Sequence, residues 1–261
     1  MKTFDELVEI IAKLRDPDGG CPWDLKQTHE TLKPYVIEES YELLEAIDSK
    51  NDDLLCDELG DVLLQVVLHA QLAKDRNAFT IEDVIQNLSN KMVRRHPHVF
   101  GDTKVSDENE VKKNWDKIKK EERSSKEKSE GIFDDIPKRL PALLRANKIG
   151  KKVSRQNFDW SDNTGVLRKI HEELTEVEEA IEQAPDNKQA ISDEIGDLLF
   201  SVAQLARKLE IDPEDSLRTC CERFGLRYSK MLSIAGKDLA SYSETELEEL
   251  WQKAKSQVFT D

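Results

Sequence analysis

Two pairs of acidic residues in the first half of the sequence could bind a metal ion together. Glu39 and Glu42 lie three residues apart, and Glu58 and Asp61 have the same spacing. Residues three apart on a helix share one face, so two packed helices would bring four carboxylates together. Charges crowded in this way at the edge of a core are unfavourable unless a cation compensates them. The pattern therefore predicts a metal site.

The second half of the sequence repeats this quartet. Glu173 and Glu176 precede Glu194 and Asp197 at the same spacings. Asp61 and Asp197 both run directly into apolar segments, unlike the other Glu-x-x-Glu pairs of this acidic chain. Because all the donors are oxygens, we expect Mg²⁺, with Mn²⁺ as a substitute.

Other metal centres fit the sequence less well. A di-iron carboxylate bundle needs Glu-x-x-His on two helices, and neither quartet contains it. The five histidines show no zinc-ligand spacing, and the four cysteines form no Cys-x-x-Cys pair. Unpaired cysteines of this kind fit a reducing cytoplasm.

Basic residues that could hold phosphate follow each quartet. Lys91 with Arg95, and Arg223 with Arg227, are pairs four residues apart, which places two cations on one helical face. One such pair is usually a solvated stripe, but its recurrence after both quartets favours a clamp for phosphate oxygens.

The four tryptophans lie at comparable places in the two halves. Trp23 and the Phe158-Asp159-Trp160 segment precede the first acidic helix of each half, and Trp115 and Trp251 close the halves. Core packing explains these positions about as well as a stacking wall for a nucleobase.

These elements belong to an internal repeat. Residues 57–70 match residues 193–206 at seven of 14 positions, and residues 38–48 match residues 172–182 at six of 11. A charged stretch with serines separates the copies. We expect one helical domain at 1–122, a flexible linker at 123–136 and a second helical domain at 137–261, each with four or five helices.

Composition and periodicity indicate an all-α fold. Charged residues make up 36% of the chain, and it has only ten glycines and eight prolines. Apolar residues at 37, 41, 44 and 47 form one helical stripe, and residues 62–73 are apolar nearly all round, which predicts a central helix packed on several sides. Short polar loops favour antiparallel bundles.

The overall charge limits the binding partners. A formal charge of −15 argues against general nucleic-acid binding, because phosphate backbones need a basic surface. The acidic N-terminal residues do not resemble a signal peptide, and the longest apolar stretch is too short to span a membrane. We expect a soluble, cytoplasmic protein.

The joint pattern resembles the MazG family of nucleoside triphosphate pyrophosphohydrolases, in particular its tandem two-domain bacterial members. The resemblance covers nearly the whole chain. It is carried by Cys-Pro-Trp-Asp at 21–24, Glu-Glu-Ser-Tyr-Glu at 38–42, Glu-Leu-Gly-Asp at 58–61, Arg-Arg-His-Pro-His-Val-Phe at 94–100, Asn-Phe-Asp-Trp at 157–160 and Glu-Ile-Gly-Asp at 194–197. It implies two all-α pyrophosphatase bundles, dimerisation, and Mg²⁺-dependent cleavage between the α and β phosphates to a nucleoside monophosphate and pyrophosphate.

The resemblance also implies roles for individual residues. The metal ligands of the second copy would be Glu173, Glu176, Glu194 and Asp197. The nucleotide contacts would be Lys169, Arg223, Arg227 and Trp251, and we include Asp193, Phe158 and Trp160 among the predicted substrate contacts. Asn157 stands where the family often has Gly, and Arg223 stands where Lys is usual.

The chemistry of these residues agrees with this activity. Hydrolysis at the α phosphorus needs an activated water, neutralised phosphates and stabilisation of the leaving pyrophosphate. Glu172 or Glu38 could accept the proton, and Arg223 with Arg227 could hold the leaving group. We favour the second copy for turnover. The alternative is an acidic helical interaction protein that is not catalytic and whose divalent-metal sites are structural.

Overall fold

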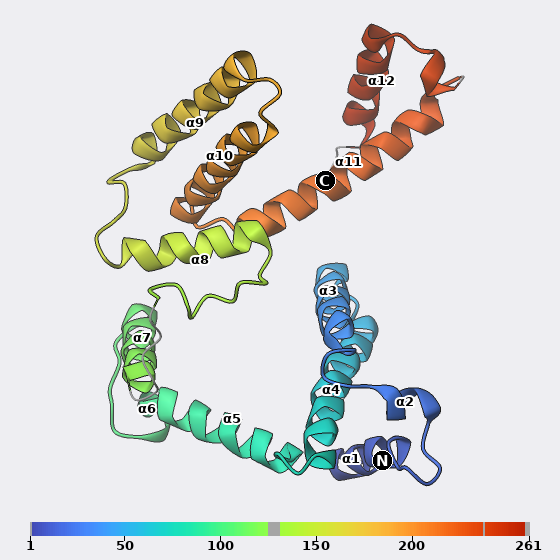
Figure 1. The fold of residues 1–261 in the computed structure, drawn as a ribbon, viewed down its shortest axis with the longest axis vertical. Coiled ribbons are helices and arrows are strands. Elements are labelled where there is room, and N and C mark those ends of the chain that lie inside the picture. The colour runs from blue at the N-terminus through green and yellow to red at the C-terminus, as the bar shows by residue number, and fades with distance from the viewer. Residues whose placement is uncertain (1, 125–130, 237, 259–261) are drawn as a thin grey trace. The chain divides into compact units, whose positions relative to one another are not determined.

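The computed structural model describes residues 2–124, 131–236 and 238–258, and the elements in these ranges are helices and turns without a strand (Figure 1). The predicted all-α class is confirmed. The chain divides into two compact units, residues 1–128 and 129–261. The division falls within the predicted linker at 123–136, of which residues 125–130 lie outside the described part.

The first unit is built around one long helical hairpin. Its helices are α1 (Phe4–Leu14), α2 (Pro22–Lys26), α3 (Lys33–Ser49), α4 (Asp52–Asp75), α5 (Ile81–Arg95), α6 (Pro97–Phe100) and α7 (Glu108–Ser124). We expected four or five helices; the very short α2 and α6 account for the higher number. Between α3 and α4, Lys50 takes a left-handed conformation and the Asn51 side chain caps α4.

The core of the first unit lies where α1 and the segment before α3 cover α4. Ile11, Leu32, Val67 and Leu68 are buried together there. Arg15 bonds Asp75 at 2.8 Å, which ties the end of α1 to the end of α4. The hairpin that carries the acidic residues is therefore anchored at the end of α4 remote from them.

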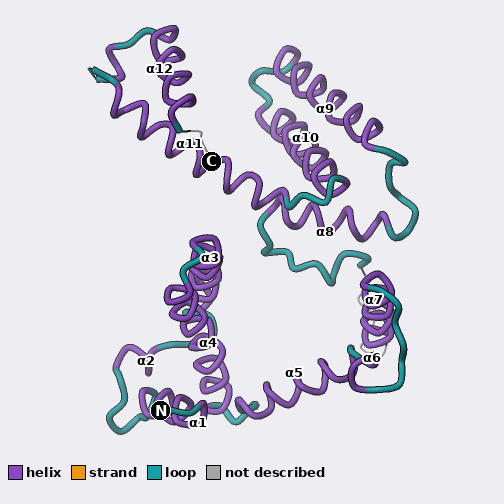
Figure 2. Tube along the Cα trace, turned by 180° about the vertical axis from the view of Figure 1, so that it is seen from behind, coloured by secondary structure: helices purple, strands orange, loops and turns teal. Residues whose placement is uncertain are grey.

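The second unit contains a matching hairpin. Its helices are α8 (Ala142–Ser154), α9 (Asn163–Gln183), α10 (Lys188–Lys208), α11 (Pro213–Ile234) and α12 (Glu244–Gln257), with a 3₁₀ turn at Leu239–Ser241 (Figure 2). α9 and α10 pack along each other, α8 packs across α10, and α12 folds back on α11.

A close approach of α8 and α10 fixes this hairpin. The Gln204 side chain lies so near Gly150 that a Cβ atom there would collide with its Oε1, and Gln204 Nε2 donates to Ala146 O at 2.9 Å. A larger residue at position 150 would therefore displace the Gln204 side chain and disturb its bond to Ala146.

Both hairpins leave apolar side chains in solvent. We expected residues 62–73 to be packed on several sides, but within one chain Leu63 and Val66 on α4 stay exposed, as do Leu199 and Val202 at the matching positions of α10. Contiguous apolar surface of this kind is uncommon on a monomer. A further finding is that none of the described helices is long and apolar enough to cross a membrane.

Candidate active sites and metal centres

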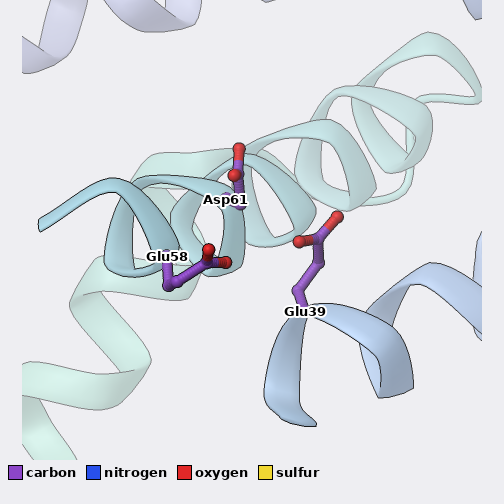
Figure 3. A group of neighbouring side chains, drawn as sticks. All are labelled: Glu39, Glu58 and Asp61. Carbon is purple, nitrogen blue, oxygen red and sulfur yellow. The ribbon is translucent and has the colours of Figure 1, made fainter. Parts of the chain in front are cut away.

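The acidic cluster of the first unit lies between α3 and α4. Glu39 on α3 and Glu58 and Asp61 on α4 each place one carboxylate oxygen within 4.8 Å of the others (Figure 3). Glu42, the fourth predicted ligand, is outside this group of three but close enough for its charge to act on Glu39 and Glu58.

The environment of the first cluster disfavours its charges. Burial raises the pKa of Glu39, and the charges of Asp61 and Glu42 raise it further. Burial and the charge of Glu42 raise the pKa of Glu58 in the same way. Glu58 Oε2 is buried and has no hydrogen-bond partner in the described part of the chain. A buried oxygen of this kind lacks a donor or a cation.

The second unit forms the same arrangement between α9 and α10. Glu173, Glu194 and Asp197 bring one carboxylate oxygen each within 4.8 Å of the others. Glu173 is almost completely buried, with 4% of its surface exposed. A hydrogen bond to Glu173 raises the pKa of Glu176, and burial adds to the shift. The fourth acid therefore touches the cluster through Glu173.

A lysine accompanies the second cluster. Lys169 Nζ lies 2.7 Å from Oε1 of Glu172 and 2.7 Å from Oε1 of Glu173, and these bonds raise the pKa of the lysine. The residue at the matching position of the first copy is Tyr35, whose ring packs edge-on against Trp23. The two clusters thus differ in positive charge, although their acids are alike.

In the first copy, Arg95 of the predicted phosphate clamp is paired with an acidic residue. Arg95 bonds Glu122 at 2.6 Å and stacks over the ring of Trp115, and Arg94 bonds the same carboxylate. These contacts, above all the hydrogen bond from Arg95, lower the pKa of Glu122 to about 2. Lys91, the other member of the predicted clamp, is half-buried on α5. No local sequence pattern indicates the pairing of Arg95 with Glu122, which lies 27 positions further along the chain.

Arg223 and Arg227 lie on α11, outside the α9–α10 hairpin that carries the acidic cluster. This helix starts beside α8 and α10 and continues to α12 (Figure 1). Trp251 on α12 packs on Phe224 of α11, with ring centroids 5.0 Å apart. This tryptophan is part of the α11–α12 core.

The two other predicted aromatic contacts line a cavity of about 460 Å³ in the second unit. Phe158, which is 79% exposed, lies at the edge of this cavity. Trp160 and Phe200 also line it. Arg207 bonds both carboxylate oxygens of Asp159 and lowers its pKa, which holds the aromatic segment against α10. On α10, Phe200 of this wall follows the metal-ligand candidate Asp197 by three residues.

The remaining predicted residues lie near the clusters. Asp193 is exposed and accepts a hydrogen bond from Gln189 at 2.8 Å. Gly60 and Gly196, between the acids of each α4 and α10 motif, have open space where a Cβ would stand. They are not packing notches among the described residues of one chain.

Comparison with known proteins settles the family. The model of the MazG nucleotide pyrophosphohydrolase domain matches residues 27–100 and 162–232, which contain both acidic clusters. The chain belongs to the MazG family. Each helical hairpin is thus the centre of one MazG domain.

Several relatives align over nearly the whole of this chain. A Thermotoga maritima protein named nucleoside triphosphate pyrophosphohydrolase/pyrophosphatase MazG is 49% identical over 255 residues, which cover 97% of this chain and 95% of the relative. An Escherichia coli K12 nucleoside triphosphate pyrophosphohydrolase is 40% identical over 260 residues, 98% of each chain. An uncharacterized Bacillus subtilis protein, YabN, is 47% identical over 97% of this chain and 51% of its own length.

The residues of both MazG domains fit a divalent cation. Their donor sets consist of carboxylate oxygens alone, as hard cations prefer. In the first domain Glu58 Oε2 has no hydrogen-bond partner among the described residues, and burial and neighbouring acids raise the pKa values of Glu39 and Glu58. Both sets can therefore hold a divalent metal ion.

Proposed function

We propose that this chain hydrolyses nucleoside triphosphates to a nucleoside monophosphate and pyrophosphate, with turnover in the second MazG domain. This proposal rests on one observation: a carboxylate cluster lies beside a lysine, with Lys169 Nζ 2.7 Å from Glu173 Oε1. The names of the full-length relatives support the reaction class.

Mg²⁺, with Mn²⁺ as a substitute, is the proposed cofactor. Glu173, Glu194 and Asp197 would hold it, with Glu176 next to them. When bound, the metal supplies charge neutralisation for the triphosphate and makes a water molecule more acidic. The matching acids Glu39, Glu42, Glu58 and Asp61 would hold metal in the first domain.

The protein side chains would perform the remaining tasks. Lys169, held beside the cluster by Glu172 and Glu173, would place an ammonium group against a phosphate oxygen. Glu172 is exposed and outside the group of three oxygens, so it would accept the proton of the attacking water. The cavity beside Phe158 and Trp160 would take the base by stacking.

We further propose that the chain acts as a homodimer. The exposed apolar residues on α4 and α10 would be buried in it. Because Arg223 and Arg227 lie outside the hairpin that carries the cluster of their own chain, they would reach the phosphates held by the second chain. Trp251, packed on the same helix, would support them.

A protein with these properties would work in the cytoplasm on the nucleotide pool, with a role in its control or sanitation. The formal charge of −15 disfavours nucleic acid as a partner, whereas a small triphosphate can be bound through metal and local cations.

The experiment is product analysis by ion-exchange chromatography over a panel of standard and altered triphosphates with Mg²⁺. We expect monophosphate and pyrophosphate in equal amounts. A diphosphate with orthophosphate would refute the cleavage position. A Mg²⁺-raised melting temperature without turnover would instead favour the interaction protein with structural metal sites.

A further inference from the structure

The cavity of about 460 Å³ in the second domain combines an aromatic wall with a small polar part. Four aromatic side chains from three separate segments line it: Phe133, Phe158, Trp160 and Phe200. Asp197, Phe200 and Gln204 follow each other at three and four residues on α10, so the metal-ligand candidate and this wall share one face of the helix. The polar part of the wall decides which flat group fits best between the rings.

Three polar side chains of this wall bond to one another and to the backbone. Arg207 Nη1 and Nη2 donate to the two carboxylate oxygens of Asp159 at 3.0 and 2.6 Å. Arg207 Nε donates to Gln204 Oε1 at 2.8 Å, and Gln204 Nε2 donates to Ala146 O at 2.9 Å. These groups hold the wall together, and a ligand could use them only by breaking the network.

Asn157 is a fourth polar residue of the wall, and it differs from the other three. It is exposed, and its side chain makes no hydrogen bond with the residues that the structure describes. Its amide offers a carbonyl acceptor beside an NH₂ donor. Adenine presents the complementary pair, an amino group next to a ring nitrogen. The amide can therefore bond to the edge of a base whose face lies against the aromatic rings.

The backbone at Asn157 allows the role of its amide to be isolated. This residue ends α8 with a left-handed φ of 62°, and its N–H donates to Ser154 O at 3.1 Å. Asn77 ends α4 in the same way, with a φ of 56° and its N–H on Lys74 O at 2.9 Å. Glycine is the residue that this conformation favours, so glycine at either position keeps the backbone and removes the amide. Of the two, Asn157 alone lines the cavity.

We propose that Asn157 determines the base preference of the second domain. Its amide donates to a ring nitrogen of the base and accepts from the neighbouring amino group, which favours adenine and other bases with this edge. The inference rests on the proposed function for the presence of a base in the cavity. The aromatic side chains hold all bases alike, because every base has a π-face. Asn157 contacts the base and not the phosphates, so its effect should fall on KM.

The test compares ATP with the triphosphate of purine riboside, which lacks the amino group, as substrates of the full-length chain with Mg²⁺. We expect kcat/KM to be about three- to tenfold higher for ATP, the value of one hydrogen bond between neutral groups. Asn157→Gly should remove this preference by raising KM for ATP. Asn77→Gly makes the same backbone exchange away from the cavity and should keep the preference.

Two further variants separate hydrogen bonding from stacking. Asn157→Asp keeps the size of the side chain but turns the donor into an acceptor. Since guanine presents two N–H donors side by side, the ratio of kcat/KM for GTP to that for ATP should rise at least about threefold in this variant. Phe158→Ala removes an exposed ring and should lower kcat/KM for ATP and for the purine riboside triphosphate by equal factors.

The outcomes separate this inference from the proposed function. An ATP preference that survives Asn157→Gly, or a wild-type chain without the preference, would overturn the inference and leave the proposed function intact, because turnover continues. A chain without turnover would contradict the proposed function. Equilibrium dialysis of the α,β-methylene analogue of ATP would then decide the inference: weaker binding by Asn157→Gly than by wild type would support it, and equal binding would overturn it.

Discussion

The two MazG domains carry the same acids on the same hairpin but surround them differently. In the second domain Lys169 compensates Glu172 and Glu173 at 2.7 Å. In the first, Tyr35 stands in its place, burial and neighbouring acids raise the pKa values of Glu39 and Glu58, and Arg95 is bound by Glu122. Equal spacing of the acids thus gives both domains a candidate metal site, whereas the cation beside the acids differs between them.

Replacing one candidate metal ligand in each domain should reveal the largest difference in activity between the two domains. We expect Glu194→Gln to lower kcat by roughly 1000-fold, equivalent to about 4 kcal/mol, because a metal ligand of the reacting domain is lost. Glu58→Gln should leave kcat within about threefold. Pyrophosphate release at saturating substrate measures both, and equal losses would contradict the division of roles.

Mixing two inactive variants tests whether the basic pair acts across chains. Glu194→Gln and Arg227→Ala should each be nearly inactive alone. After co-refolding, random heterodimers contain one intact site, so activity should return to about a quarter of the wild-type value. A mixture that remains as inactive as its components would show that the cluster and Arg227 must be on one chain.

Replacing Lys169 by tyrosine, the residue type at the matching position 35 of the first domain, should make the second domain resemble the first. Lys169→Tyr should lower kcat/KM by roughly 10- to 100-fold, since a charge-assisted hydrogen bond to phosphate is lost. Arg168→Tyr, at the exposed neighbouring position, is the control and should have little effect. Initial rates at low substrate concentration give the answer, and equal losses in the two variants would contradict a specific role for Lys169.

The smallest expected effect concerns Glu122 in the first domain. Pairing with Arg95 and Arg94 lowers the pKa of this glutamate from its ordinary 4.5 to about 2. This pair therefore stabilises the fold above about pH 4.5, and its contribution is lost as the pH falls towards 2. Glu122→Gln should lower the melting temperature by a few degrees at pH 7, with the difference from wild type shrinking below pH 4. Asp102→Asn, in an exposed loop, serves as control; a pH-independent difference would contradict the ion pair.

The sequence predicted much of the frame and part of the site. The repeat and the helical periodicity are local or internal signals, and they located both hairpins and both acidic clusters. Glu42 and Glu176 lie beside the groups of three: the charge of Glu42 acts on Glu39 and Glu58, and Glu176 shares a hydrogen bond with Glu173. The contact of Lys169 with Glu172 and Glu173 was not predicted, although spacings of three and four residues on a helix could have indicated it.

The long-range pairings were not predicted from the sequence. The contacts of Arg95 with Glu122 and of His29 with His69 join residues 27 and 40 positions apart. Their existence depends on where α7 and the segment before α3 pack, which no local pattern determines. For the same reason the exposed side of the apolar helix at residues 62–73 could not be foreseen.

Crystallography can test directly whether both clusters hold divalent ions. It can also show whether the ions of the second cluster meet a substrate beside Lys169. Crystals grown with Mn²⁺ and an α,β-methylene triphosphate should show anomalous density among Glu173, Glu194 and Asp197 and among Glu39, Glu58 and Asp61, with Lys169 on a phosphate oxygen. Triphosphate bound elsewhere, with no ion among either set of acids, would contradict the account.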